Sequence, residues 1–394
     1  MVTPLQPARA AVAESARVAA GSAVTGSKPA SGPESVTFQE ATKRYPDGTV
    51  AVEHLDLECP AGQISVLVGP SGCGKTTSLR MVNRMVTPTS GRILLNESDV
   101  AAMDAASLRR QMGYVIQNAG LFPHRTIEDN ISTVPVLMGA TRREARAAAA
   151  GLMERVGLDL ALARRYPYQL SGGQQQRVGV ARALAADPPV LLMDEPFSAV
   201  DPLVRAELQR ELLRLQGDLG KTIVFVTHDI DEAIVLGDQI AVFQHGGHLA
   251  QVASPETLLS APVSTFVDDF LGGDKGVKWL SFIDTATIPL HSGPLQRPDD
   301  PAGPAGGTAW QLLVDGSSRA LGWLPPGTSD RSAVQACRRT FHPGTDPMRS
   351  ALDSALLSPA GLAVAVGPDD RVLGLASHAD IATVIRAARG RHVN

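Results

Sequence analysis

The chain has little of what marks a secreted, membrane-spanning or nucleic-acid-binding protein. It has only three cysteines in 394 residues, too far apart for a metal site or a disulfide framework, which favours a reducing compartment. No apolar run reaches the roughly 18 residues that a membrane-spanning helix needs, and residues 1–34 lack the apolar core of a secretory signal. With 36 basic and 40 acidic residues, the chain lacks a strong field for polyanions. We therefore expect a cytoplasmic protein without a nucleic-acid partner.

Changes in composition divide the chain into three parts. Residues 1–34 are mostly Ala, Ser, Gly, Val and Pro, so we expect a disordered leader. Between 35 and 272, short apolar runs alternate with helical patterns, which is typical of an α/β domain with a buried, largely parallel sheet. Within this domain, residues from about 118 to 165 indicate a helical subdomain. The composition shifts again after Gly272, and we expect a small α+β domain over 273–394.

The C-terminal part contains a weak internal repeat. LLVDGSSRALGWL (312–324) aligns without a gap with VAVGPDDRVLGLA (364–376), at an offset of 52 residues (364 − 312). Each copy predicts a strand, a polar turn and a second strand that contains Arg-x-Leu-Gly. The copies differ, because Pro325 and Pro326 follow the first copy and no proline follows the second at the same place.

A glycine-rich loop follows the apolar segment ISVLV (64–68). The loop, GPSGCGKT, fits the pattern G-x-x-x-x-G-K-[ST]. Glycines let backbone N–H groups turn towards phosphate oxygens, and a helix expected to begin near Lys75 points its positive end at them. We expect Lys75 to reach the β- and γ-phosphates of ATP, and Thr76 to ligate Mg²⁺. The expected nucleotide-binding residues of this loop are Gly69, Pro70, Ser71, Gly72, Cys73, Gly74, Lys75, Thr76 and Thr77.

Two carboxylates follow another apolar run, in the segment VLLMDEP. In enzymes with such a loop, the first acidic residue after the strand holds Mg²⁺, usually through water. Side chains alternate along a strand, so adjacent carboxylates are expected to have different roles. We assign Asp194 to the metal and Glu195 to the general base that polarises the attacking water.

The segment LSGGQ (170–174) separates this chain from other proteins with the same loop. Together with Gln117 in YVIQN, with SAVD (198–201) and with His228 in FVTHD, it makes the chain resemble the ATP-binding subunits of ABC transporters. The resemblance extends from Tyr45 to about residue 272. It implies a P-loop ABC-type ATPase domain that binds ATP and Mg²⁺.

The resemblance also implies a head-to-tail pair of cassettes around two ATP molecules. The signature segment of one copy would meet the γ-phosphate held by Lys75 of a second copy, through a helix start that binds anions. The signature residues with this role are Ser171, Gly172, Gly173 and Gln174. Asp201 would bridge to the partner's phosphate-binding loop. One chain alone would therefore lack a complete site.

Three further positions receive roles from the resemblance. Tyr45 would stack on adenine. Gln117 would contact Mg²⁺ or the attacking water and report the nucleotide state to a membrane partner. His228 would hold the γ-phosphate and help to order the water. The expected catalytic residues are Lys75, Gln117, Glu195 and His228, and the expected metal ligands are Thr76, Gln117 and Asp194.

Longer segments resemble one transporter type, the quaternary-amine importers of glycine betaine, carnitine, choline or proline betaine. They cover residues 117–139, 193–212 and 227–243. This type implies transmembrane permease subunits, a solute-binding protein that acts indirectly, and a peripheral place on the cytoplasmic face of the membrane. An importer of polyamines, sulfate or sugars remains an alternative. A non-transport ABC ATPase is disfavoured, because only 96 residues (171 − 75) separate Lys75 from Ser171.

The C-terminal part resembles the paired CBS domains behind the cassette of many betaine-type subunits, with a degenerate first copy. The repeat and the segment GLASHADI (374–381) carry this resemblance. In a CBS domain, Ser377 and Asp380 would lie where the ribose of a nucleotide is held. A sensing role and a purely structural role for this part both remain open.

Overall fold

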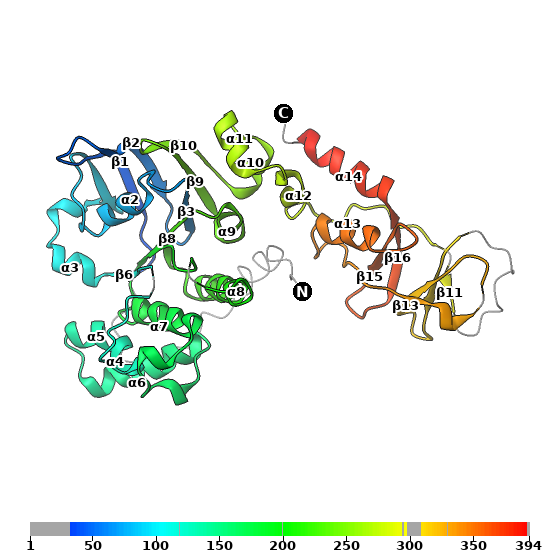
Figure 1. Ribbon diagram of the computed structural model, residues 1–394, viewed down its shortest axis with the longest axis horizontal. Helices are drawn as coiled ribbons and strands as arrows, with labels where there is room; N and C mark the ends of the chain where they lie inside the picture. Colours follow the sequence, from blue (N-terminus) through cyan, green and yellow to red (C-terminus); the bar gives the residue numbers. More distant parts are fainter. Residues whose placement is uncertain are drawn as a thin grey trace. The chain divides into compact units, whose positions relative to one another are not determined.

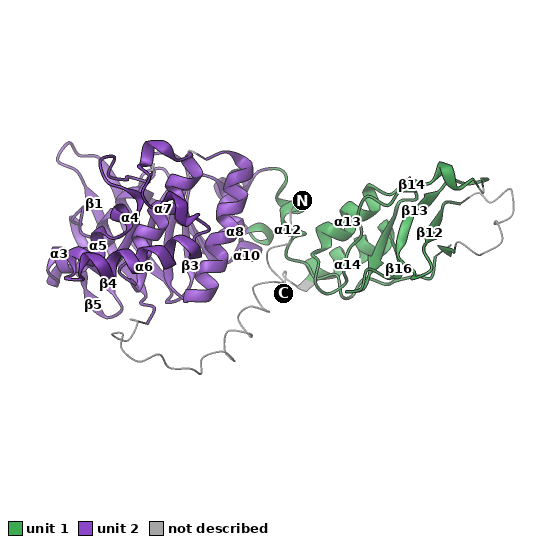
Figure 2. Ribbon diagram, turned by 90° about the horizontal axis from the view of Figure 1, so that it is seen from below, with its two compact units in different colours: residues 1–12, 259–261, 273–394 green, residues 13–258, 262–272 purple. Residues whose placement is uncertain are grey.

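The computed structural model describes residues 32–117, 119–198, 200–293, 295–297, 309–328 and 330–391. The leader expected over 1–34 lies outside the described residues, apart from its last three. The chain divides into two compact units (Figure 2). Of the described residues, the larger unit contains 32–258 and 262–272, and the smaller contains 259–261 and those from Gly273 onwards.

The larger unit is built on a six-stranded sheet of order β10-β9-β3-β8-β7-β6 (Figure 1). All neighbours pair in parallel except the edge strand β10. Every residue of β3, β7 and β8 is buried, which explains their continuous apolar sequences. The strands are β3 (Ile64–Val68), β6 (Met112–Val115), β7 (Val190–Asp194), β8 (Thr222–Thr227), β9 (Gln239–Gln244) and β10 (His248–Ala253).

A second, antiparallel sheet of order β2-β1-β4-β5 belongs to the same unit. Its strands are β1 (Val36–Arg44), β2 (Val50–Cys59), β4 (Ser90–Leu95) and β5 (Ser98–Asp99). Helix α2 (Lys75–Val82) contributes Leu79 to one hydrophobic core with Phe38 of this sheet and Phe243 of the six-stranded sheet. The first turn of α2 is thereby held at the ends of the buried strands.

Short helices after β6 form the helical part of the larger unit (Figure 1). Thr141 begins the longest of the first three with a capping box to Glu144. Helix α7 packs against α4, α6 and β6, so it joins the helical part to the sheet. The elements are α4 (Ile127–Ile131), α5 (Thr133–Leu137), α6 (Arg142–Arg155), η2 (Leu160–Leu162), η3 (Pro167–Gln169) and α7 (Gly172–Leu184).

The remaining helices connect the strands or follow the sheet. Asp201 caps the long helix α8, which has proline at its first position and ends at Gly220 with a φ of 61°. The elements are η1 (Val100–Ala102), α3 (Ala105–Arg110), α8 (Pro202–Leu219), α9 (Ile230–Leu236), α10 (Pro255–Ser260) and α11 (Thr265–Leu271). None of the helices in the described ranges is long and apolar enough to cross a membrane.

The smaller unit contains two hairpins at the positions of the 52-residue repeat. β12 and β13 form the first hairpin, and β15 and β16 form the second. The elements are α12 (Lys275–Trp279), β11 (Leu295–Gln296), β12 (Gln311–Val314), β13 (Ala320–Leu324), η4 (Arg331–Ala333), β14 (Gln335–Ala336), α13 (Met348–Leu356), β15 (Leu362–Val366), β16 (Val372–Ser377) and α14 (His378–Arg391).

The two hairpin turns match residue by residue. Ser318 has a φ of 64° and Asp370, 52 residues later (370 − 318), has a φ of 63°. Arg319 and Arg371, which are also equivalent, pair with each other in an antiparallel bridge. The hairpins are therefore related by an approximate two-fold axis.

Further segments of the unit pair with the strands of each hairpin. β11 pairs in parallel with β12, and β14 pairs antiparallel with β13. In the second half, Phe341 pairs in parallel with β15 and His291 pairs antiparallel with β16. The segment around His291 precedes the first hairpin along the chain but pairs with the second hairpin. β14 leads towards the second hairpin but pairs with the first. The two halves therefore exchange these two segments.

The halves differ in their helices. The second half has α13 before its hairpin and α14 directly after it, whereas the only helix formed by the described residues between β13 and β14 is the short η4. Pro325 and Pro326 stand where the helix after the first hairpin would begin, and proline disfavours the helical conformation of the residue before it. The residues just before the first hairpin, 298–308, lie outside the described part of the chain.

Candidate nucleotide site

The glycine-rich loop lies between the carboxyl end of β3 and the first turn of α2. Its close packing requires glycine, because a Cβ atom at Gly69 would overlap the carbonyl oxygen of Phe243. A Cβ atom at Gly74, where φ is 95°, would overlap the carbonyl oxygen of Ala51 in the same way. The glycines therefore bring the backbone N–H groups of the loop close to the sheet and leave their open side for a ligand.

Lys75 is the first residue of α2, and its ammonium group lies inside the loop. Its Nζ atom donates to the carbonyl oxygens of Gly69 at 2.7 Å and Pro70 at 2.8 Å. The residue is only 5% exposed. The positive charge of Lys75 and the unpaired N–H groups at the helix start thus converge on one place, which suits a polyphosphate.

Thr76 and Asp194 form an oxygen pair beside this loop. The hydroxyl group of Thr76 donates to Oδ1 of Asp194 at 2.8 Å. Burial raises the pKa of the Asp194 carboxyl, while the Thr76 hydrogen bond and the Arg80 charge oppose that rise. No cluster of three or more His, Cys, Asp or Glu side chains in the described ranges could bind a metal alone. A metal held by this pair would complete its ligands with phosphate and water, as Mg²⁺ does.

Glu195 follows Asp194 but faces a different neighbour. Oε2 of Glu195 lies 3.1 Å from Nδ1 of His228, which follows the neighbouring strand β8. The backbone of Glu195 has a φ of 45°, and its N–H donates to the carbonyl oxygen of Val226 at 2.9 Å. The left-handed conformation turns the chain at the end of β7. The carboxylates of Asp194 and Glu195 therefore have separate partners.

Gln117 lies close to the segment after these carboxylates. Its Nε2 atom donates to the hydroxyl oxygen of Ser198 at 3.4 Å, and that hydroxyl donates to the carbonyl oxygen of Glu195 at 3.0 Å. The structure thus brings Gln117, Glu195 and His228 into one neighbourhood.

The signature segment begins helix α7. The Ser171 hydroxyl accepts from the Gln174 N–H at 3.3 Å, and the Gln174 side chain accepts from the Ser171 N–H at 3.0 Å, so together they form a capping box. A Cβ atom at Gly173 would lie 2.5 Å from Cγ1 of Val204 in α8. Glycine is therefore needed for helix packing here. Within the described residues, no hydrogen bond joins this segment to the glycine-rich loop.

Tyr45 follows β1 in the turn that leads into β2. Its ring is 37% exposed, and the Nζ atom of Lys43 lies 5.3 Å from the ring centre. Ala51 of the same hairpin contacts Gly74, so this hairpin lies against the glycine-rich loop. The exposed ring is thus available for stacking beside the loop.

Sequence reasoning missed two residues of this site. Arg80 places Nη2 3.7 Å from Oδ2 of Asp194, and Ser198 links Gln117 to the chain after Glu195. Arg80 lies four residues after Thr76 on α2, so helical spacing could have indicated that both face β7. The contact of Ser198 depends on a loop more than 80 residues away along the chain, and no local pattern predicts it.

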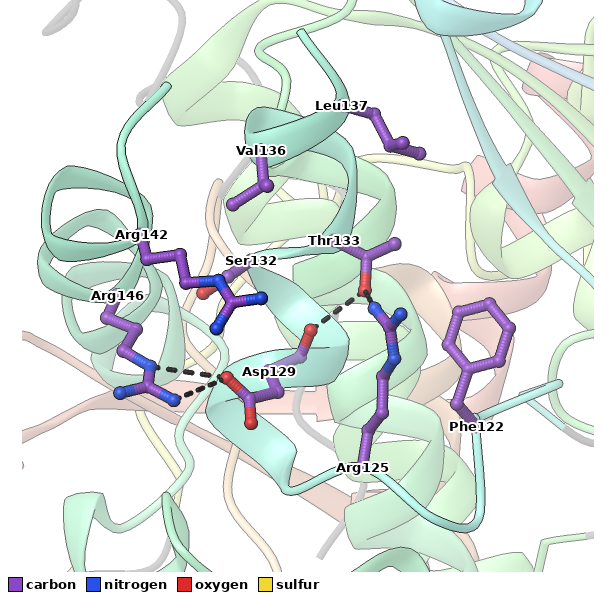
Figure 3. Close-up of a pocket in the computed structure, with 9 residues that line it drawn as sticks. All are labelled: Phe122, Arg125, Asp129, Ser132, Thr133, Val136, Leu137, Arg142 and Arg146. Atoms are coloured by element: carbon purple, nitrogen blue, oxygen red, sulfur yellow. Dashed lines mark hydrogen bonds and ion pairs between the residues drawn. The ribbon is translucent and has the colours of Figure 1, made fainter. Parts of the chain in front are cut away.

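A pocket of about 460 Å³ lies between helices of the helical part (Figure 3). The residues that line it begin at Phe122, shortly after Gln117 in the chain. Arg146 donates to Oδ1 of Asp129 from Nη2 at 2.9 Å, and Arg125 donates to the Thr133 hydroxyl at 3.1 Å. Figure 3 shows Arg125 alongside the ring of Phe122. The apolar side chains Val136 and Leu137 also line the pocket. Its wall therefore combines positive charge with exposed apolar surface.

Comparisons with known proteins agree with this arrangement. The sequence model of a family described as ABC transporter matches residues 52–198. The chain is 42% identical over 355 residues to the osmoprotectant import ATP-binding protein OsmV of Salmonella typhimurium, covering 86% of this chain and 92% of that protein. It is 48% identical over 238 residues to the carnitine transport ATP-binding protein OpuCA of Listeria monocytogenes, covering 60% of each.

Solved structures give the same result for the larger unit. The ABC cassette MJ0796, solved as a dimer, has a TM-score of 0.52 and 30% identity, covering 56% of this chain and 98% of that one. CbiO1 of Clostridium perfringens, described as part of the ABC transporter complex CbiONQ, has a TM-score of 0.54 and 29% identity, covering 57% and 90%. With the glycine-rich loop, the carboxylate pair and the signature segment in place, the chain belongs to the ATP-binding subunits of ABC transporters, in the group of osmoprotectant importers.

Proposed function

We propose that this chain hydrolyses ATP to power the import of a quaternary-amine osmoprotectant through a separate membrane permease. The proposal rests on two pairs of side chains that lie at the carboxyl ends of the neighbouring strands β7 and β8. Thr76 and Asp194 form one pair, and Glu195 and His228 form the other. Glycine betaine, carnitine, choline and proline betaine are the candidate solutes, because relatives such as OpuCA of Listeria monocytogenes are named for carnitine transport.

The first pair would bind the nucleotide and its metal. Residues 69–77 would hold the phosphates, with Lys75 on the β- and γ-phosphates. Thr76 and Asp194 would hold Mg²⁺, with Gln117 as a third ligand or a contact to the attacking water. Bound Mg²⁺ neutralises charge on the phosphate oxygens during phosphoryl transfer.

The second pair would perform hydrolysis. Glu195 would accept a proton from the water that attacks the γ-phosphorus, while ADP leaves with the electron pair of the broken P–O bond. His228 would fix the position of the Glu195 carboxylate and contact the γ-phosphate. The 3.1 Å separation of the two side chains supports this division of roles.

The complete site would form only in a dimer. Ser171, Gly173 and Gln174 would contact the γ-phosphate bound by a second copy, and Asp201 would approach the loop of that copy. Two observations support this. Within the described part of one chain, no hydrogen bond connects the signature segment with the loop, and the similar cassette MJ0796 is described as a dimer. Tyr45 would stack on the adenine.

The pocket beside the Gln117 segment would bind the permease. Its apolar rim includes Phe122, which is 40% exposed, and Leu137, which is 66% exposed. Exposed apolar patches of this kind mark protein contacts. Docking here would place the chain at the cytoplasmic face of the membrane, and a solute-binding protein would act only through the permease.

We further propose that residues 35–272 form the cassette, with the helical subdomain at about 118–165, and that 273–394 form a degenerate CBS pair. The approximate two-fold relation of the hairpins and the exchanged strands support this assignment. Oδ2 of Asp380 accepts from the Ser377 N–H at 2.9 Å and lies 3.1 Å from Nε2 of His291. Asp380 therefore holds the start of α14, which supports a structural role for this carboxylate.

Uptake measurements test the substrate assignment. Cells that lack this chain should lose ATP-dependent uptake of radiolabelled glycine betaine, carnitine or choline, and the wild-type chain should restore it. Restoration by the wild-type chain but not by Lys75→Ala would link the uptake to nucleotide binding. Loss of polyamine, sulfate or sugar uptake instead would reject the quaternary-amine assignment while leaving the ATPase assignment in place.

A further inference from the structure

Arg182 on the signature helix α7 binds the turn that follows Gln117. Its Nη2 atom donates to the carbonyl oxygen of Ala119 at 2.8 Å, and its Nη1 atom donates to that of Gly120 at 2.8 Å. Both residues of the turn have left-handed backbones, with φ of 56° and 53°. The alanine conformation is unfavourable by itself, so the two hydrogen bonds help to hold the turn in this shape.

The guanidinium group of Arg182 binds this turn and forms no ion pair with a described carboxylate. None of the described carboxylates lies within salt-bridge distance of its guanidinium group, and burial lowers the pKa of Arg182. Removing a cation from water is unfavourable unless polar groups replace the water. Here those groups are the carbonyl oxygens of Ala119 and Gly120, whose spacing matches the planar fork of an arginine.

A second contact fixes the same turn to the same helix. Gly179 lies three residues before Arg182 on α7, and a Cβ atom there would be 3.3 Å from Cβ of Ala119. The helix backbone therefore touches the turn at one point and binds it through Arg182 at another. Because Ser171 is the N-cap of α7, the turn after Gln117 is joined through this helix to the signature segment.

Arg182 also contacts the wall of the pocket. The ring of Phe122 lies close to two guanidinium groups, with Cζ of Arg125 at 5.1 Å and Cζ of Arg182 at 5.9 Å from its centre. Phe122 lines the pocket beside Arg125 (Figure 3). One side chain thus contacts both the turn after Gln117 and the aromatic ring that faces the pocket.

We propose that Arg182 is a positioning residue. It holds Gln117, the turn residues Ala119 and Gly120, the ring of Phe122 and the signature helix together as one body. The inference rests on the proposed function, because it concerns how Gln117 is placed for ATP hydrolysis.

The test uses the purified full-length chain and MgATP. Arg182→Lys keeps the positive charge but removes the second hydrogen bond of the fork. We expect kcat to fall roughly ten- to a hundredfold, the loss typical of a misplaced catalytic group, with KM and the affinity for a fluorescent ATP analogue unchanged within about twofold. Arg177→Lys is the matched control, because Arg177 lies on the same helix and donates to a carbonyl oxygen elsewhere, that of Val156, at 2.7 Å.

A double-mutant cycle separates positioning from general destabilisation. In a Gln117→Ala background, Arg182→Lys should cause almost no further loss of kcat, because the group that it positions is already absent. An equal loss in both backgrounds, or an equal loss in Arg177→Lys, would overturn the proposal. If the wild-type chain does not hydrolyse ATP, the proposed function fails, and that outcome is distinct from the failure of this inference.

A second variant covers the case in which Arg182→Lys does not fold. Gly179→Ala keeps the guanidinium group but adds a methyl group that presses on Ala119. We expect the same pattern, a lower kcat that depends on the presence of Gln117, with a smaller amplitude. If Gly179→Ala folds and its kcat equals that of the wild type, the rigid connection between the helix and the turn is refuted.

Discussion

Thr76 on α2 and Asp194 at the end of β7 share a hydrogen bond of 2.8 Å, although 118 residues separate them along the chain. The bond joins the phosphate-binding loop to the carboxylate pair. It also stabilises the charged form of Asp194, a carboxylate whose pKa is raised by burial. A raised pKa in the folded state means that the charged form of Asp194 destabilises the fold as pH rises above the unfolded pKa of about 4.

Replacing Asp194 with Asn should therefore separate activity from stability. The amide oxygen can still accept the Thr76 hydrogen bond, but the charge that would attract the proposed Mg²⁺ is lost. We expect ATP hydrolysis to fall by about two orders of magnitude, as when one preorganised electrostatic group is removed. The thermal unfolding midpoint at pH 7 should remain the same or rise. Asp218→Asn, which alters a surface ion pair on α8, is the control and should leave hydrolysis unchanged.

Replacing Glu195 with Gln should keep ATP binding but remove the proposed base. Phosphate release should fall by about a hundredfold or more, the range for loss of a general base. A nucleotide-bound dimer should accumulate, because closure would no longer be followed by hydrolysis, and size-exclusion chromatography with ATP would detect it. Near-normal turnover would show that another group activates the water.

Mixing two inactive variants tests whether the signature acts across the dimer. Lys75→Ala removes the proposed phosphate contact, and Ser171→Arg blocks the signature segment. In a heterodimer of the two, one composite site is intact and the other carries both defects. The mixture should therefore hydrolyse ATP faster than either variant alone. If heterodimers form, as co-purification of two tags would show, and activity does not rise, the assignment across the dimer is wrong.

The pH dependence of the C-terminal unit should follow Asp380. Hydrogen bonds from Ser377, with a contribution from His291, lower the pKa of Asp380 to about 2. A lowered carboxyl pKa stabilises the fold at pH values above the unfolded pKa of about 4, and this contribution is lost as pH falls towards 2. Asp380→Asn should lower the unfolding midpoint of this unit at pH 7. The difference from the wild type should disappear below pH 2, and a difference that persists there would contradict the prediction.

Deletion of residues 273–394 distinguishes the two roles open to the C-terminal unit. If the unit senses the cell interior, the truncated complex in vesicles should still hydrolyse ATP but lose its response to internal salt or to an adenine nucleotide. Screening makes such a response physically reasonable, because the Debye length is already about 8 Å at 0.15 M salt. If the unit only stabilises the dimer, the response should persist while assembly weakens. An unchanged salt and nucleotide dependence would reject the sensing role.

The features that could be predicted from sequence are those that depend on local pattern. β3, β7 and β8 are buried along their whole length, so each appears as an apolar run. The glycine-rich loop also has a local pattern, since its close approach to Phe243 and Ala51 requires glycine at fixed spacing. The hairpins of the C-terminal unit could be expected for the same reason, because each turn and its flanking strands are contiguous.

The features that could not be predicted depend on contacts between distant segments. The carbonyl acceptors of Arg182 lie 62 and 63 residues away, and nothing near Arg182 indicates them. His291 pairs with Leu375, which lies far from it along the chain of the C-terminal unit. Apolar periodicity predicts which face of an element is buried but not which partner covers it, so such contacts require the folded chain.

The left-handed backbone of Glu195 has a consequence for how this chain could evolve. A residue with a Cβ atom costs about 1 kcal/mol or more in that conformation, and glycine does not. The chain therefore holds its proposed base at a position where its own backbone favours another residue. Selection for thermal stability alone would favour glycine there and remove the proposed base, so a Glu195 with that role would persist only while ATP turnover is itself selected.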